Sequence, residues 1–204
     1  MSTYADLKAQ VLSAIGRDDS VAEAYAEKGL NYGVLSAAIL FSPPELDIKT
    51  DGAITAGNAS AVIDSDVLLR EIQTLYNSTD SKKIWLMPKD KFDILTGGLT
   101  GPIEFATRHG MTIFFSPTAE HYTEIKVLYS SYPASVTNMA EDLPFINYDS
   151  FIVSEATTFS FSCLEEEESA KSFEGIATRL LQVHTLDKQK REQLEEALRS
   201  GYNL

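Results

Sequence analysis

The chain has little of what most catalytic and metal-binding proteins use. It contains one cysteine and three histidines in 204 residues. A single cysteine, Cys163, excludes an intramolecular disulfide and a Cys-x-x-Cys metal or redox site. The histidines His109, His121 and His184 stand in no catalytic or ligand-spacing motif, so we interpret each as structural or exposed. We therefore expect no cofactor, no metal ion and no enzymatic activity.

Long apolar runs are also missing. No window reaches the roughly 18 uninterrupted apolar residues that a membrane span needs. The first residues, MSTYADLKAQ, lack a basic start followed by an apolar stretch. We expect no membrane anchor and no export by a standard signal. The single cysteine fits synthesis in a reducing cytoplasm.

Basic residues are outnumbered by acidic ones. The chain has 17 Lys and Arg against 30 Asp and Glu, which gives a net charge of −13 at pH 7. Tight nonspecific binding of nucleic acid needs clustered Lys and Arg and is therefore disfavoured. An acidic surface favours solubility, and it also repels a DNA duplex that passes beside it.

Two helices are predicted at the N-terminus. Apolar residues recur every four positions over 3–15, and Gly16 ends this first helix. The second helix covers 20–41, with a capping box formed by Ser20 and Glu23.

Two glycines lie inside the second predicted helix. Gly29 and Gly33 each weaken a helix by roughly 1 kcal/mol relative to alanine, so we interpret them as places where another helix packs closely. The C-terminal half of this helix is expected to be buried through Leu30, Val34, Leu35, Ala38, Ile39 and Phe41.

From residue 46 the period changes from helical to strand-like. Short β-branched and aromatic segments alternate with turn residues in LDIKTD, SAVID, REIQTLYN and SKKIWLM. KDKFDIL predicts one helical turn, and 96–102 a flexible glycine-rich loop. A hairpin is predicted to turn at His109 and Gly110, and TEIKVLYSSYP is expected to pair beside it with Ile125, Val127 and Tyr129 on one face.

Two more helices are predicted after the strands. Residues 148–163 carry a wide apolar stripe that predicts a central, buried helix, in which Cys163 is a small buried hydrophobe. The consecutive acids 165–168 favour the positive end of the last helix. The residues of that helix expected to face inward are Phe173, Ile176, Ala177, Leu180 and Leu181.

The end of the last helix has a different character. Residues 187–193 are polar on every side, which is typical of a helix that has left its own core. We interpret 187–204 as a projecting assembly arm. The candidate interface residues on it are Lys188, Lys190, Arg191, Leu194, Leu198 and Tyr202.

The predicted fold class is therefore α+β. A helical bundle is expected from the N-terminal helix pair in 1–45 and the two C-terminal helices in 134–186. A β-rich insert, 46–133, separates them, and the arm 187–204 follows.

In their order these segments resemble the head-to-tail adaptor (connector, or head-completion) proteins of tailed bacteriophages. The resemblance includes the strand pair GPIEFATRHGMTIFFSPTAEHYTEIKVLYSSYP, with a proline and polar turn at 116–121 and a strand ending in YSSYP at 129–133. It continues in the acidic-Leu-Pro segment 142–146, which leads into the penultimate helix, and in the long charged final helix.

The resemblance implies a structural virion protein at the neck between head and tail. Such adaptors form a ring, typically of twelve subunits, that docks beneath the portal after DNA packaging and extends the DNA channel. They carry the tail tube or nozzle and, in some phages, fibres, while double-stranded DNA passes without specific binding. The insert, with Trp85 and Tyr76, is then expected to face tail components. The C-terminal arm is expected to reach the portal or a neighbouring subunit.

Two other functions remain open at this point. The thirty acidic residues offer many possible carboxylate pairs for a cell-wall-degrading enzyme. Alternatively, the insert is a carbohydrate- or receptor-binding module in which Trp85 and the tyrosines serve as stacking platforms. The place of Trp85 between Ile84 and Leu86 also fits a tryptophan in the core or at an interface.

Overall fold

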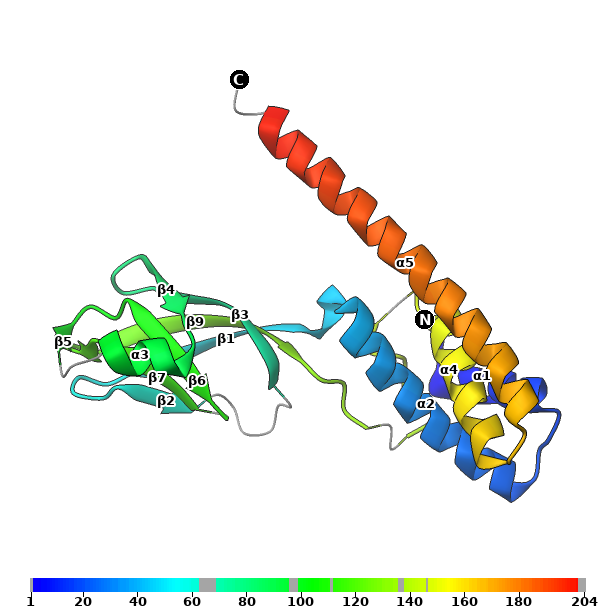
Figure 1. The fold of residues 1–204 in the computed structure, drawn as a ribbon. Coiled ribbons are helices and arrows are strands. Elements are labelled where there is room, and N and C mark those ends of the chain that lie inside the picture. Colours follow the sequence, from blue (N-terminus) through cyan, green and yellow to red (C-terminus); the bar gives the residue numbers. More distant parts are fainter. Residues whose placement is uncertain are drawn as a thin grey trace. The chain divides into compact units, whose positions relative to one another are not determined.

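The computed structural model describes residues 2–62, 69–95, 99–110, 112–135, 138–145 and 147–201, with the side chains at 62, 69, 95, 187, 188 and 191–201 left out of the description. The fold is mixed α+β, with five α-helices in the part of the chain described. Contacts divide it into two compact units (Figure 1). The helical unit comprises Met1–Glu45 with Pro133–Leu204, and the sheet unit comprises Leu46–Tyr132.

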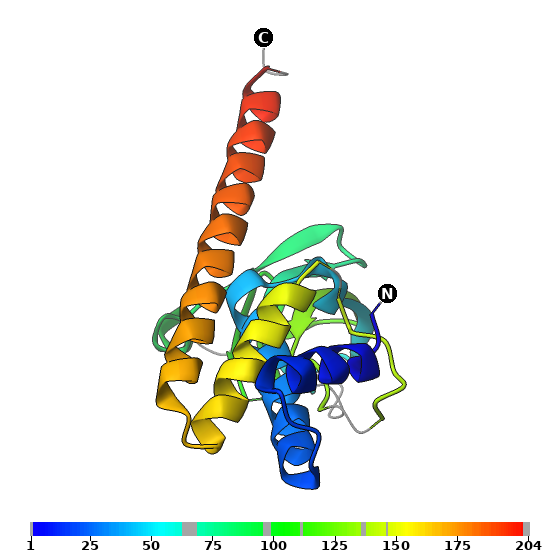
Figure 2. The same cartoon turned by 90° about the vertical axis from the view of Figure 1, so that its right-hand side faces the viewer.

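Four helices form the helical unit: α1 (Tyr4–Ile15), α2 (Ser20–Phe41), α4 (Asp149–Cys163) and α5 (Glu167–Gly201). Helix α4 contacts each of the other three, so the prediction that this helix is central is confirmed (Figure 2). Its buried side chains include Phe151, Ile152, Ala156 and Phe161.

The predicted N-terminal cap of α2 is wrong. Helix α2 begins at Ser20, but its cap is Asp19, whose Oδ1 accepts hydrogen bonds of 3.1 Å from the N–H groups of Val21 and Ala22. One carboxylate oxygen thus satisfies two free N–H groups, and no box between Ser20 and Glu23 is needed. A capping box does occur at α1, between Thr3 and Asp6.

The two glycines of α2 lie against the backbone of α4, as their interpretation required. A Cβ atom added to Gly29 would lie 2.6 Å from the carbonyl oxygen of Ala156, and one added to Gly33 would lie 2.7 Å from that of Ile152. Both distances are shorter than any ordinary contact of a Cβ atom. Only glycine therefore permits α2 and α4 to pack this closely.

The sheet unit contains a seven-stranded sheet in the order β1-β9-β3-β4-β6-β7-β2. Its strands are β1 (Asp47–Ile54), β2 (Ser60–Val62), β3 (Leu69–Asn77), β4 (Lys82–Leu86), β6 (Phe105–His109), β7 (Thr112–Ser116) and β9 (Thr123–Ser131). The two end strands of that order, β1 and β2, also contact each other, so that the sheet is nearly closed. The other elements are α3 (Lys89–Leu95) and the paired two-residue strands β5 (Thr100–Gly101) and β8 (Thr118–Ala119).

Strand pairing confirms one sequence prediction and corrects another. Strands β6 and β7 form the predicted hairpin, with His109 opposite Thr112 at its turn. Strand β9 does not pair beside this hairpin, because it lies between β1 and β3. Alternating apolar residues place one face of a strand in a core but do not select its partner.

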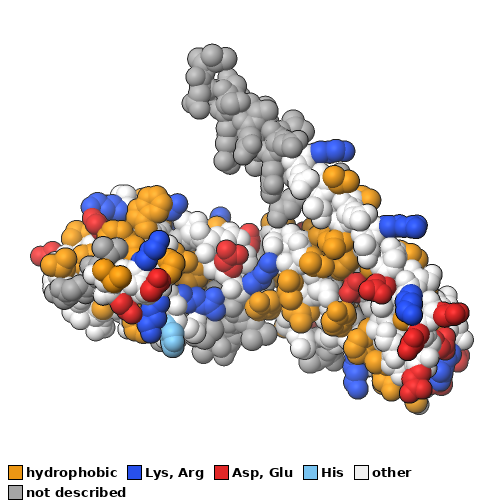
Figure 3. Space-filling view, viewed as in Figure 1, with side chains coloured by type: hydrophobic (Ala, Val, Ile, Leu, Met, Phe, Trp, Pro, Cys, Tyr) orange, Lys and Arg blue, Asp and Glu red, His pale blue; other side chains and the backbone are white. Residues whose placement is uncertain are grey.

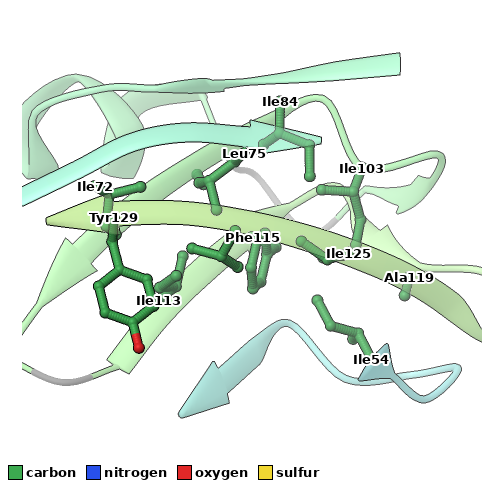
Figure 4. Packing of buried hydrophobic residues seen from close by; sticks show 12 residues of the cluster. Ile54, Ile72, Leu75, Ile84, Ile103, Ile113, Phe115, Ala119, Ile125 and Tyr129 are labelled. Atoms are coloured by element: carbon green, nitrogen blue, oxygen red, sulfur yellow. The ribbon is translucent and has the colours of Figure 1, made fainter. Parts of the chain in front are cut away.

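One apolar cluster fills the interior of the sheet unit (Figure 4). Ile125, Val127 and Tyr129 of β9 alternate into it, as predicted. Side chains from the neighbouring strands complete the cluster, among them Ile54, Ile72, Leu75, Ile84, Ile113 and Phe115.

Candidate assembly surface

Helix α2 also carries apolar side chains that are exposed. Val21, Tyr32, Leu35 and Ile39 are each between 40% and 50% exposed. Their spacing of three, four and eleven residues places them along one face, which we call the α2 face. The prediction that Leu35 and Ile39 are buried is wrong, because both side chains are exposed. Helix α4 packs on Gly29 and Gly33, and its Phe159 ring stacks on the Tyr32 ring with centroids 5.8 Å apart.

Helix α5 runs antiparallel to α4 and continues past it. The ring of Phe173 lies 5.7 Å from that of Phe161 near the end of α4. The ring of His184 lies 5.2 Å from that of Tyr148, which immediately precedes α4. Helix α4 has 15 residues and α5 has 35. From about residue 185, α5 therefore extends beyond the helix it packs on (Figure 1).

The packed part of α5 also has an exposed apolar side. Ile176, Val183 and Leu186 are 42%, 56% and 55% exposed, and we call them the α5 face. Of the residues expected to face inward, Ala177 is buried, whereas Ile176 is not. The others, Phe173, Leu180 and Leu181, are half-buried.

The α2 and α5 helices meet at the C-terminal end of α2. The ring centroids of Phe41 and His184 are 5.0 Å apart. Hydrophobic side chains gather over this part of the helical unit (Figure 3). His184 is thus held among aromatic rings, in agreement with its interpretation as a structural residue.

A half-buried carboxyl group lies on α4 beside these helices. Burial raises the pKa of Glu155, and the negative charge of Glu174 on α5 raises it further. Folding therefore disfavours the ionised form of Glu155. The charge on this side chain opposes folding at neutral pH, and protonation at lower pH removes that opposition.

We expect Glu155→Gln to stabilise the protein at pH 7. Solvent screening of a half-exposed group limits the gain to about 0.5 kcal/mol, or roughly 1–2 °C in melting temperature. The gain should shrink as the pH falls through the raised pKa of Glu155, because the wild-type carboxyl group then becomes neutral. Thermal unfolding at pH 7 and pH 4 measures this. An equal difference at both pH values would contradict the electrostatic explanation.

The predicted arm residues lie on or beyond the last turns of α5. Lys190 is exposed on the helix. Lys188, Arg191, Leu194 and Leu198 belong to α5 by their backbone, and their side chains fall outside the description. Tyr202 lies outside the described residues altogether.

The two candidate residues of the insert share one outward face of the sheet unit. Trp85 is 59% exposed, so it is not a core residue, and Tyr76 is 38% exposed. Tyr76 is paired with Lys83 across β3 and β4, and the Nζ atom of Lys83 lies 4.9 Å from the centroid of the Trp85 ring. Lys83 thus joins the two aromatic residues into one surface group.

The remaining chemistry-bearing side chains are dispersed. His109 is exposed, His121 lies 3.6 Å from a carboxylate oxygen of Asp80, and Cys163 is half-buried rather than buried. Within the described ranges, no three His, Cys, Asp or Glu side chains come together in an arrangement that could hold a metal ion. None of the described helices combines the length and the apolar character that crossing a membrane requires.

Comparison with known proteins gives no family for this chain. No family model and no curated protein matches its sequence.

Proposed function

We propose that this chain is a subunit of a head-to-tail adaptor ring of a tailed bacteriophage. The ring docks beneath the portal after DNA packaging, extends the DNA channel and carries tail or nozzle proteins. The observation that carries this proposal is the exposed apolar surface of the helical unit, together with the length of α5. Helix α5 continues past α4, and α2 and α5 expose apolar faces that a partner protein would bury.

The two apolar faces favour a ring over a simple dimer. The α2 face and the α5 face belong to different helices of one subunit. If the α5 face of one copy packs on the α2 face of the next, the contact joins two different surfaces. Such head-to-tail contacts close into rings when the rotation between subunits allows it.

The charge of the chain suits a DNA conduit. With a net charge of −13, the protein repels the phosphate backbone of a passing duplex. The sheet unit supplies a separate surface for tail components in this proposal. Its outward group of Tyr76, Lys83 and Trp85 combines aromatic rings with a positive charge, a composition common at protein interfaces.

Ile176→Asp, on the α5 face, tests the assembly surface. We expect this variant to fold like the wild type but to lose assembly, because a charge replaces an apolar side chain that the neighbouring subunit would bury. Solution mass and negative-stain images, with and without the portal protein encoded in the same genome, measure this.

Ile94→Asp is the matched control. Ile94 is 82% exposed on α3 in the sheet unit, so the same substitution there should leave ring formation unchanged. A wild-type monomer that binds no portal would contradict the proposed function. A monomer that assembles only with the portal would support it, because binding to a partner can drive assembly.

A further inference from the structure

The inner face of β1 lacks bulk at its centre. Register with β9 places Thr50 opposite Val127 and Gly52 opposite Ile125. Val127 and Ile125 point into the core, and residues paired across strands lie on the same side of the sheet. Thr50 and Gly52 therefore occupy inward positions with a small side chain or none.

An apolar cavity of about 190 Å³ lies where that bulk is missing. It is lined by β1 and by inward side chains of the neighbouring strands, among them Ala61, Ile113, Phe115, Ile125 and Val127. Figure 4 shows Ile113, Phe115 and Ile125 pointing toward the side of the unit on which Ile54 lies. The cavity has the volume of a single bulky side chain, and it is below the roughly 300–1,000 Å³ typical of small-molecule sites.

Strand β1 offers a backbone edge at the same place. All eight of its residues pair with β9 on one side. On its other side β2 contacts β1, but no described strand is hydrogen-bonded to β1 there, so the sheet is left open at this seam. Every second residue of an antiparallel strand turns its N–H and C=O groups away from its partner. Strand β1 thus presents backbone donors and acceptors beside the cavity.

We propose that this edge binds an extended segment of a partner protein, which adds a strand beside β1 and places one bulky apolar side chain in the cavity. Backbone hydrogen bonds supply affinity in such strand addition, and a pocket for one side chain supplies selectivity. Lys49 and Asp51 alternate on the outward side of β1, and Lys126 of β9 lies opposite Asp51. The net charge of −13 favours a polar partner segment that carries lysines.

Blocked heptapeptides of alternating threonine and lysine with a central phenylalanine test this on the full chain. We expect the amide resonances of residues 47–54 to shift on titration. The same peptide with central alanine should bind at least ten-fold more weakly, because it leaves the cavity empty. N-methylation of the peptide backbone on the side that faces β1 should abolish binding, since it removes the donors while keeping the phenylalanine.

The variant Gly52→Val tests the cavity in a protein that still folds. Weaker peptide binding by this variant then results from the filled cavity and not from unfolding. A Cβ atom at Gly52 would meet only the carbonyl oxygen of Ile125, at 3.9 Å, so the larger side chain fits and occupies the cavity. We expect this variant to fold and to bind the phenylalanine peptide at least ten-fold more weakly. Thr74→Val is the matched control, because Thr74 is exposed on β3 and does not line the cavity, and it should bind like the wild type.

Three results would overturn the proposal. These are equal affinity for the phenylalanine and alanine peptides, unchanged binding by Gly52→Val, and binding of toluene at this cavity without binding of the phenylalanine peptide. The last would identify a site for small apolar molecules instead. The titration does not depend on ring formation, so its outcome is separate from that of the assembly test.

Discussion

Replacing Gly29 and Gly33 together with alanine is expected to destabilise the helical unit by about 3 kcal/mol. Each new methyl group would lie less than 3 Å from a carbonyl oxygen of α4, and a backbone atom cannot move away as a flexible side chain can. The better helix propensity of alanine, worth about 1 kcal/mol at each site, offsets only part of that strain. Urea unfolding followed by circular dichroism at 222 nm measures the loss.

Gly175→Ala is the matched control within the same unit. Gly175 lies inside α5, and a Cβ atom there would have no neighbour within 4 Å. Alanine should therefore stabilise the protein by about 0.5–1 kcal/mol. Hydrogen exchange, followed peptide by peptide, should locate the loss in the double glycine variant to α2 and α4. An unchanged unfolding midpoint in that variant would show that the two helices can separate without cost.

A chain ending at Thr185 is expected to stay folded and to lose all ring formation. The truncation keeps the contacts of Phe173 with Phe161 and of His184 with Phe41 and Tyr148. It removes the part of α5 that extends past α4. The free energy of unfolding should change by less than about 1 kcal/mol, because the deleted segment lies outside that helix pair. Circular dichroism and solution mass give the two readouts.

The control for this truncation is a chain that ends at Gly201. It retains the whole of α5 and should assemble like the full chain. Unfolding of the chain that ends at Thr185 would show that the last turns of α5 belong to the core. Rings formed by that shorter chain would show that the α2 face and the retained α5-face residues Ile176 and Val183 suffice for assembly without the end of α5.

Local sequence signals predicted several elements well. The apolar spacing and glycine that predicted a first helix over 3–15 correspond to α1, which ends at Ile15 before Gly16 in a left-handed conformation. The β6–β7 hairpin turns at the predicted residues. These features depend on neighbouring residues, whose spacing and backbone preferences can be read directly from the chain.

The wrong predictions concern tertiary contacts: which side chains of a helix another helix covers, and which strands pair. Leu35 and Ile39 are as apolar as core residues, yet both are exposed, and nothing in the local pattern tells which apolar side chains of α2 are covered by α4. Val21, Tyr32, Leu35 and Ile39 nevertheless share a helical spacing, which could have revealed a second apolar face. Similarly, the alternation in β9 could not select β1 and β3 as its partners.

The sheet unit begins and ends on the paired strands β1 and β9. Asp47 lies opposite Ser130, and the hydroxyl group of Ser131 donates a hydrogen bond of 3.2 Å to the carbonyl oxygen of Leu46. Gln73 donates to both Asp47 and Ser130 and so ties the same two strands together. An inserted domain whose entry and exit are neighbours can be shortened, exchanged or deleted while the host helices keep their connection. This junction gives evolution, and protein engineers, a place to change what the molecule attaches to without redesigning the rest.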